Sequence, residues 1–233
     1  MTPELDGVFF DAAGTLISVR EPVGTTYARF AGRHGMGLDP AAAERAFRAL
    51  FARAETPAYG APGAGHGSGE AVDRAWWSRL VWRVFRQAGV AGLEEERFEN
   101  CFRDVFRHYG TGAAWKLYPE VRGVLDALRG RVRLAVVSNF DARLEGVLVD
   151  LGIGAVFDAV VVSSAVEACK PDPALFREAL RRCRIADPAR AMHAGDSPHE
   201  DWEGAAAAGL RVFRLTRGAN DLSGILGCLS VKT

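Results

Sequence analysis

The stretch VFFDAAGTL, residues 8–16, runs three apolar residues directly into an aspartate, two alanines and a glycine. A short apolar run that stops near a glycine is typical of a strand buried on both faces, as in a parallel sheet. Asp11 then follows the carboxyl end of that strand, the edge at which open α/β sheets carry their chemistry. An aspartate in this place is also a common turn residue, so the interpretation depends on polar partners at other strand ends.

Strands and helices alternate after residue 118. We predict buried strands at residues 133–137, 158–162, 191–194 and 211–215, separated by helices at residues 119–128, 142–151, 173–183 and 200–208. A β-α-β rhythm favours right-handed crossovers and a doubly wound, mostly parallel sheet. The expected fold class is therefore α/β.

Residues 21–109 interrupt this alternation with apolar residues at helical spacing. Asp39-Pro40 predicts a capped helix start, and the Gly/Pro/Ala-rich residues 57–69 predict a loop. Four amphipathic helices of this kind can close a small bundle. We therefore predict an α/β core domain of residues 1–17 and 114–233, with a helical-bundle domain of residues 18–113 inserted after the first strand.

Composition narrows the class of protein. Of 233 residues, 48% are hydrophobic and 25% are charged, with 29 acidic and 29 basic side chains. This balance predicts neither a nucleic-acid nor a membrane partner, and no apolar run approaches the ~20 residues of a bilayer span. The first residues lack a secretion-signal pattern, and the four cysteines lack metal-site spacing. We expect a cytoplasmic protein that is a monomer or weak homodimer, since no heptad repeat or exposed strand is evident.

Polar residues of different chemistry follow four of the predicted strands. They are Asp11, Ser138-Asn139, Lys170 in the stretch KPDP, and Asp196 with Asp201 in the stretch GDSPHED. A carboxylate can act as a nucleophile toward phosphorus, while a hydroxyl and an amide can hold phosphate oxygens. Clustered carboxylates beside phosphate are the usual Mg²⁺ arrangement. Each signal alone also fits a turn, a surface loop or a helix first turn, but the four together predict phosphoryl transfer on a small phosphorylated molecule.

The order and spacing of these motifs resemble the haloacid dehalogenase superfamily, nearly from end to end of the chain. Within the superfamily, the chain further resembles the haloacid dehalogenase-like hydrolase domain-containing protein 3 group. The segments that carry this resemblance are SNFDARLEG at residues 138–146, KPDP at 170–173, Tyr59-Gly60, His66-Gly67 and Trp76-Trp77. The resemblance implies a Rossmann-like core and a helical cap domain. It also implies that Asp11 attacks phosphorus and Lys170 offsets its charge. By the same resemblance, Thr15, Ser138 and Asn139 hold the phosphoryl group, and Mg²⁺ is held by Asp11, the Ala13 carbonyl, Asp196 and Asp201.

Ala13 departs from the superfamily's phosphatases, in which a second aspartate at this position is the general acid and base. A positioned acid or base typically contributes ~10²–10⁴-fold. Three alternatives to a phosphatase with weakened acid–base catalysis follow: a binding or regulatory module on the same fold, a 2-haloacid dehalogenase, or a phosphonatase-type C–P hydrolase. Dehalogenases need no metal, so the pair Asp196 and Asp201 fits a dehalogenase site poorly. Phosphonatases need a cap-domain lysine, and the three lysines of the chain, Lys116, Lys170 and Lys232, lie outside residues 18–113.

Side chains of the predicted cap could replace the missing acid. The candidates are Glu21, His34, His66 and Glu70. Arg20 could reach a substrate carboxylate or phosphate, although we favour the role of a solvated hinge residue for it. Each of the histidines is more often a solvated loop residue than a catalytic one.

Overall fold

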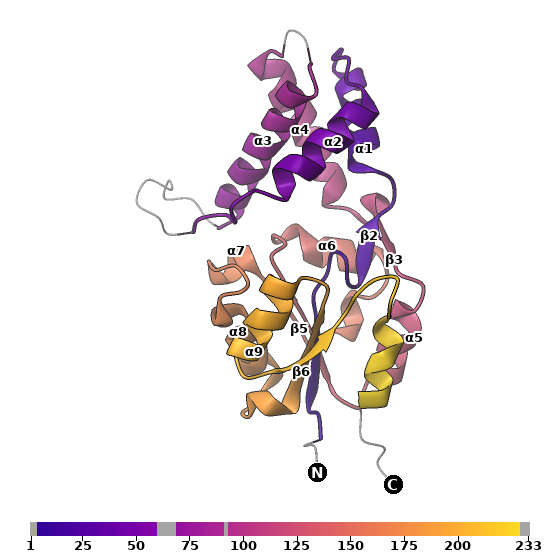
Figure 1. Ribbon diagram of the computed structural model, residues 1–233, viewed down its shortest axis with the longest axis vertical. Coiled ribbons are helices and arrows are strands. Elements are labelled where there is room, and N and C mark those ends of the chain that lie inside the picture. The colour runs from indigo at the N-terminus through magenta and orange to yellow at the C-terminus, as the bar shows by residue number, and fades with distance from the viewer. Residues whose placement is uncertain (1–3, 60–68, 91–92, 229–233) are drawn as a thin grey trace. The chain divides into compact units, whose positions relative to one another are not determined.

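The computed structural model describes residues 4–59, 69–90 and 93–228. The chain divides into two compact units. The core unit comprises Met1–Ser18 and Lys116–Thr233, and the helical unit comprises Val19–Trp115. Figure 1 labels many of the elements of both units. The core unit is thus discontinuous in sequence, because the helical unit is inserted shortly after the first strand.

The core unit is built on a five-stranded sheet in the order β5-β4-β1-β6-β7, and its neighbouring strands pair in parallel. Its strands are β1 (Gly7–Phe10), β4 (Arg133–Ser138), β5 (Ala159–Val162), β6 (Ala191–Gly195) and β7 (Arg211–Arg214). In β1, Phe10 lies opposite Val136 of β4 on one side and Ala194 of β6 on the other. The prediction of an α/β fold with a mostly parallel sheet is confirmed.

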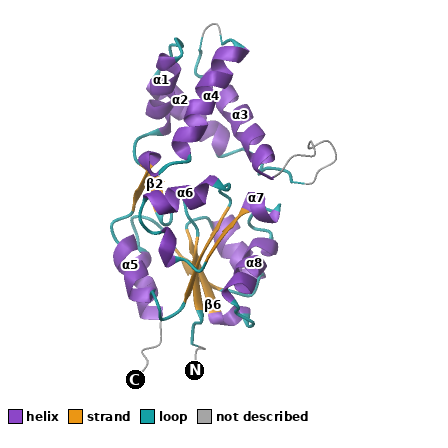
Figure 2. Cartoon of the chain, turned by 180° about the vertical axis from the view of Figure 1, so that it is seen from behind, coloured by secondary structure: helices purple, strands orange, loops and turns teal. Residues whose placement is uncertain are grey.

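The sequence of β1 explains its central place. All four residues of the strand are buried, so both faces of the strand need apolar side chains. Phe9 belongs to the same buried cluster as Leu175 and Phe176 of α8, whereas Phe10 meets the edge of Phe157, with ring centroids 6.5 Å apart. Figure 2 shows α5 and α8 on opposite sides of the strands. An apolar run without alternation is what a strand covered on both faces requires.

Helical segments cover the two faces of this sheet. They are α5 (Val121–Leu128), α6 (Arg143–Asp150), α7 (Ser163–Val166), α8 (Pro173–Cys183), α9 (Gly204–Ala207) and the 3-10 segment η5 (Leu222–Cys228). The helix predicted at residues 200–208 is in fact a π-helical turn, η4 (Pro198–Glu203), followed by α9. Its wider winding arises because the Trp202 amide bonds to Ser197 O, five residues back, while the Trp202 indole donates to Gly195 O at 2.8 Å.

A second, two-stranded sheet pairs β2 (Ile17–Val19) with β3 (Trp115–Leu117), at the two points where the chain passes from one unit to the other. These strands and the four-residue α7 were not predicted. Each is too short for the periodicity of its side chains to be read from the sequence. The predicted helix at residues 119–128 also begins two residues later, at Val121.

The helical unit contains α1 (Val23–Arg33), α2 (Pro40–Phe51), α3 (Gly69–Gln87) and α4 (Glu95–Tyr109). As the sequence predicts, Asp39 caps α2, accepting a hydrogen bond of 2.7 Å from the Ala42 amide. The apolar faces of the four helices share one cluster that includes Tyr27, Phe85 and Phe102. Most of the predicted loop at residues 57–69 lies outside the described residues, and Gly69 already belongs to α3. In the described part of the chain, every helix is too short or too polar to cross a bilayer.

Candidate active site

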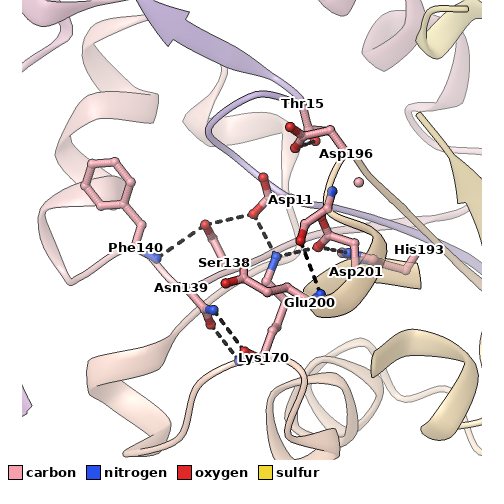
Figure 3. Close-up of polar contacts among 12 residues, drawn as sticks. Asp11, Thr15, Ser138, Asn139, Phe140, Lys170, His193, Asp196, Glu200 and Asp201 are labelled. Carbon is pink, nitrogen blue, oxygen red and sulfur yellow. Dashed lines mark hydrogen bonds and ion pairs between the residues drawn. The ribbon is translucent and has the colours of Figure 1, made fainter. Parts of the chain in front are cut away.

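Four segments of the core unit bring the predicted site residues together at the carboxyl edge of the sheet (Figure 3). Asp11 directly follows β1, and Ser138 is the last residue of β4. Asp196 directly follows β6, while Lys170 precedes the start of α8. Because β1 pairs with both β4 and β6, its carboxyl end lies between theirs. The order of the strands therefore makes one site of residues that are up to 190 positions apart.

Asp11 is anchored through one of its two carboxylate oxygens. Oδ1 accepts a hydrogen bond of 3.0 Å from Ser138 Oγ and one of 2.8 Å from Lys170 Nζ. Among the described residues, none donates a hydrogen bond to Oδ2. The side chain is thus held in one orientation by Oδ1 while its second oxygen remains available for attack or for a cation.

Lys170 links Asp11 to a second buried carboxylate. Its ammonium donates to Asp201 Oδ1 at 2.6 Å, and both side chains are only 1% exposed. Asp201 Oδ1 also lies 2.9 Å from His193 Nε2, and Oδ2 accepts from the Ser197 amide at 3.0 Å. Both oxygens of Asp201 are therefore engaged within the protein, which fixes the position of the Lys170 ammonium.

Glycine is required directly before this acidic segment. A Cβ atom on Gly195 would lie 2.2 Å from Asp201 Cγ, too close for any side chain. The close approach lets the Asp201 carboxylate fold back against the end of β6. Gly195 of the GDSPHED stretch is thus required by the packing of Asp201.

Burial and charge oppose each other in this site. Burial and the charge of Asp201 raise the pKa of Asp11, although Lys170 lowers it. Burial would also raise the pKa of Asp201, but Lys170 and His193 together lower it below its usual range. Burial lowers the pKa of Lys170, yet the two carboxylates outweigh burial and raise it. Lys170 therefore remains a cation, and Asp201 remains its permanent counter-charge.

Asn139 holds the backbone of Lys170. Its Nδ2 donates to Lys170 O at 3.1 Å, and its Oδ1 accepts from the Lys170 amide at 2.6 Å. This reciprocal pair joins the end of β4 to the loop before α8. Asn139 was predicted to hold phosphate, and the structure adds a positioning role in which both ends of the amide are engaged.

The turn after Asp11 carries Ala13, Gly14 and Thr15. Gly14 has φ of +96°, and a Cβ atom on it would lie 2.5 Å from Asp196 Oδ2. The buried hydroxyl of Thr15 donates to Asp196 Oδ1 at 3.1 Å. Glycine is therefore needed both for the backbone conformation and for the close approach of Asp196. Ala13 is exposed in this turn and offers only a methyl group where a carboxyl would serve as an acid.

Asp11, Asp196 and Asp201 form an acidic cluster. Each offers a carboxylate oxygen, and these three oxygens all lie within 4.8 Å of one another. Burial raises the pKa of Asp196, and the charges of Asp11 and Asp201 raise it further. Hard carboxylate oxygens suit Mg²⁺, which would relieve this mutual repulsion. Since both Asp201 oxygens accept hydrogen bonds, Asp11 and Asp196 are the more available donors.

Comparison with known proteins identifies the family. The model of the haloacid dehalogenase-like hydrolases matches residues 5–209, which include all of the site residues predicted from the sequence. The chain belongs to the haloacid dehalogenase-like hydrolase family. The resemblance inferred from the motifs is thus confirmed.

Individual relatives support the assignment of this chain to the haloacid dehalogenase-like hydrolases. It is 37% identical to haloacid dehalogenase-like hydrolase domain-containing protein 3 of Mus musculus, over 88% of this chain and 79% of that protein. It is 36% identical to phosphoserine phosphatase of Thermus thermophilus, over 74% of this chain and 65% of that protein. The HAD-hydrolase YfnB of Bacillus subtilis, solved bound to magnesium, shares the fold with a TM-score of 0.70 at 17% identity, over 98% of this chain and all of that one. Phosphatases are therefore among its homologues.

Two residues of this hydrolase's site were missed from the sequence. His193 is fully buried in β6 against Asp201, and Phe176 meets its ring edge-on at 5.0 Å. A lone histidine within the apolar residues 191–194 is a signal that could have been read. Arg217 contacts the turn that carries Thr15, and the sequence around it offers no signal.

The proposed replacements for the missing acid lie in the helical unit of this hydrolase. Glu21 accepts from Arg29 at 2.5 Å and from Thr26 at 2.8 Å, and the hydrogen bond from Arg29 lowers its pKa. A carboxyl with a lowered pKa is a poor proton donor at neutral pH. His34 Nε2 lies 3.0 Å from Asp104 Oδ2.

The remaining candidates of the helical unit lie elsewhere. Arg20 Nη2 donates a hydrogen bond to Trp115 O at 2.8 Å, and Glu70 is exposed in the first turn of α3. His66, with Gly60 and Gly67, lies outside the described residues.

Proposed function

We propose that this protein is a Mg²⁺-dependent phosphohydrolase that acts on a small phosphorylated molecule through an aspartyl phosphate on Asp11. The observation that supports this most is the asymmetric anchoring of Asp11. Ser138 and Lys170 hold one oxygen, while no described residue hydrogen-bonds to the other. A nucleophile held in this way is oriented for attack without the loss of its reactive lone pairs.

The proposed reaction has two steps. In the first, Asp11 Oδ2 forms a bond to phosphorus, and the bond between phosphorus and the leaving oxygen breaks. The leaving alkoxide takes up a proton as it departs. In the second, water attacks phosphorus, the bond to Asp11 breaks, and inorganic phosphate is released with one proton. Lys170 offsets negative charge next to Asp11 throughout, because two buried carboxylates keep it a cation.

The acidic cluster fits Mg²⁺ in the chemistry of its donors. We propose that Asp11, Asp196 and the carbonyl of Ala13 would hold the ion, with Asp201 beside them. When bound, Mg²⁺ would neutralise charge on the transferring phosphoryl oxygens. Thr15, Ser138 and Asn139 stay the predicted contacts of the phosphoryl group. Of these, Thr15 already bonds to Asp196, so the same hydroxyl can align the acid and the substrate.

Ala13 limits which leaving groups we expect the protein to accept. An aryl or acyl oxygen departs readily, whereas an alkoxide needs a proton that Ala13 cannot supply. The second step likewise lacks a base at this position. We therefore propose slow turnover with a persistent aspartyl phosphate. The role of the helical unit as a cap, the absence of nucleic-acid and membrane partners, and a monomeric or weakly dimeric state all stay predictions.

The test is hydrolysis of an aryl phosphate and of a simple alkyl phosphate, each with Mg²⁺ and with a chelator. We expect a burst of phenol release followed by slow turnover of the aryl ester, dependent on Mg²⁺. Intact-protein mass spectrometry after rapid quenching should detect one added phosphoryl group. The Asp11→Asn variant should show neither the burst nor the added mass.

Other results would replace the proposal. Metal-independent release of halide from a 2-haloacid would make the protein a dehalogenase. Tight binding of phosphate esters without turnover or added mass would make it a binding or regulatory module on the same fold.

A further inference from the structure

Arg217 follows β7 and contacts the turn that carries Ala13, Gly14 and Thr15. Its Nε donates to Gly14 O at 3.1 Å, and its Nη2 donates to Thr15 O. Both acceptors are backbone carbonyls, three and four residues after the proposed nucleophile Asp11. The segment after the edge strand β7 is thus tied to the segment after the central strand β1.

Two further contacts fix the guanidinium itself. Its Nη1 forms an ion pair of 2.5 Å with Glu120, and the exposed fractions of the two side chains are only 23% and 12%. The ring of Tyr118 lies against the guanidinium, with 3.5 Å between the ring centroid and the Arg217 Cζ. A planar guanidinium can satisfy three acceptors and stack on a ring at once, which a lysine ammonium cannot do. The geometry is therefore specific to arginine.

The turn also makes hydrogen bonds that do not involve Arg217. They run from the Thr15, Leu16 and Ile17 amides to Ala12 O, from the Gly14 amide to Ile17 O, and from the Thr15 hydroxyl to Asp196. The carbonyls of Gly14 and Thr15 point outward to Arg217 instead. Gly14 adds freedom, since its φ of +96° is a conformation that only glycine adopts readily. Arg217 therefore adds two hydrogen bonds from outside the turn to those that the turn makes itself.

We propose that Arg217 is a positioning residue that locks this turn, and through it the Ala13 carbonyl and the Thr15 hydroxyl, next to Asp196. Its catalytic consequence rests on the proposed function, whereas its effect on the turn does not. Misplacement of reacting or binding groups by about 1 Å can lower the reaction rate by ~10²-fold. A residue that holds the turn in place should therefore also maintain the rate.

The test compares Arg217→Ala and Arg217→Lys with a matched control, Arg190→Ala. Arg190 also forms a two-point ion pair, through Nε and Nη2 to Asp6 at 2.5 and 2.6 Å, but at the amino end of β6. The first measurement is amide hydrogen exchange of a peptide covering residues 12–17. A peptide covering β4 serves as the internal reference for global opening.

In Arg217→Ala we expect exchange of residues 12–17 to rise by about 10-fold or more relative to the β4 peptide, the size expected for lost charge-assisted hydrogen bonds. Arg217→Lys should fall between this variant and the natural protein, and Arg190→Ala should match the natural protein. The second measurement is hydrolysis of the aryl phosphate. We expect kcat to fall by ~10- to 100-fold in Arg217→Ala with a smaller change in KM.

Unchanged exchange of residues 12–17 in either folded Arg217 variant would overturn the inference. If Arg217→Ala does not fold, Arg217→Lys decides, because it keeps the charge but cannot reach all three acceptors. Faster exchange with unchanged kcat would show that the clamp is real but does not serve catalysis. If the natural protein hydrolyses no ester, the proposed function fails, while the exchange measurement still decides the role of Arg217.

Discussion

The ammonium of Lys170 donates a 2.6 Å hydrogen bond to Asp201, and each of the two side chains is 1% exposed. Asp201 does not contact Asp11 through a hydrogen bond, but it fixes the position of the Lys170 ammonium, which does. Lys170 is the only buried lysine among the described residues. His193 and the Ser197 amide in turn hold Asp201. The Asp11 carboxylate is therefore oriented by a chain of hydrogen bonds that begins at His193 in the interior of β6.

The first prediction concerns Lys170. Lys170→Met removes the cation but keeps the length of the side chain, leaving two buried carboxylates without it. We expect a loss of ~3–5 kcal/mol in the free energy of unfolding at neutral pH, measured with urea. Adding Asp11→Asn to this variant should recover part of the loss, since one uncompensated carboxylate is then removed. A double variant as unstable as Lys170→Met alone would show that the charge on Asp11 does not cause the loss.

Asp11→Asn tests the nucleophile. Asparagine keeps the acceptor for Ser138 and Lys170 but lacks the charged oxygen that attacks phosphorus. We expect turnover to vanish while the free energy of unfolding changes by about 1 kcal/mol or less, because burial already disfavours the charge of Asp11. The measurements are ester hydrolysis and urea unfolding. Retained hydrolysis would mean that the reaction takes place at another site.

Asp196→Asn tests the metal. The mutual repulsion of three clustered carboxylates should drive Mg²⁺ binding, so loss of one charge should weaken it by at least ~10-fold in titration calorimetry. The matched control is Asp187→Asn, which alters an exposed aspartate that caps a short turn at Pro188–Arg190. Equal affinity in the natural protein and in Asp196→Asn would remove Asp196 from the metal site.

Ala13→Asp restores the acid that this chain lacks. Because Ala13 is exposed, a longer side chain should be accommodated there without loss of stability. We expect hydrolysis of a simple alkyl phosphate to rise by at least ~10-fold, and hydrolysis of the aryl ester to change much less. Ala13→Asn is the control, with the same shape and no acidic proton. An equal gain in both variants would assign the effect to shape, and equal alkyl and aryl rates in the natural protein would point to another proton donor.

Tyr109 should make stability fall in alkaline solution. Burial raises the pKa of this phenol to about 12. An acid with a higher pKa in the folded than in the unfolded state binds its proton more tightly when folded. Its contribution is therefore complete below the unfolded pKa of ~10 and is lost as the pH rises toward 12. We expect the natural protein to lose about 1 kcal/mol more than Tyr109→Phe between pH ~9 and ~11, measured with urea. Parallel pH curves for the two proteins would contradict this.

The sequence by itself determined the α/β class, the insertion after the first strand and the order of the site residues. These features can be predicted because the patterns that indicate them span only a few residues. Examples are the unbroken apolar run of β1 and the pair Asp39-Pro40 at the start of a helix. The same reasoning could not find β2, β3 or the π-helical turn at Pro198–Glu203. Each of these is decided by a few specific hydrogen bonds rather than by the spacing of apolar side chains.

Only the tertiary structure decided which atoms meet. The pairing of β1 between β4 and β6 sets Ser138 and Lys170 on the same oxygen of Asp11, and leaves the other oxygen without a hydrogen bond from any described residue. The contact of His193 with Asp201 spans only 8 positions, but the pairing of β6 with β7 brings Arg217 to Gly14, 203 positions away. Such contacts arise from the packing of whole strands, because no local propensity relates one strand end to another.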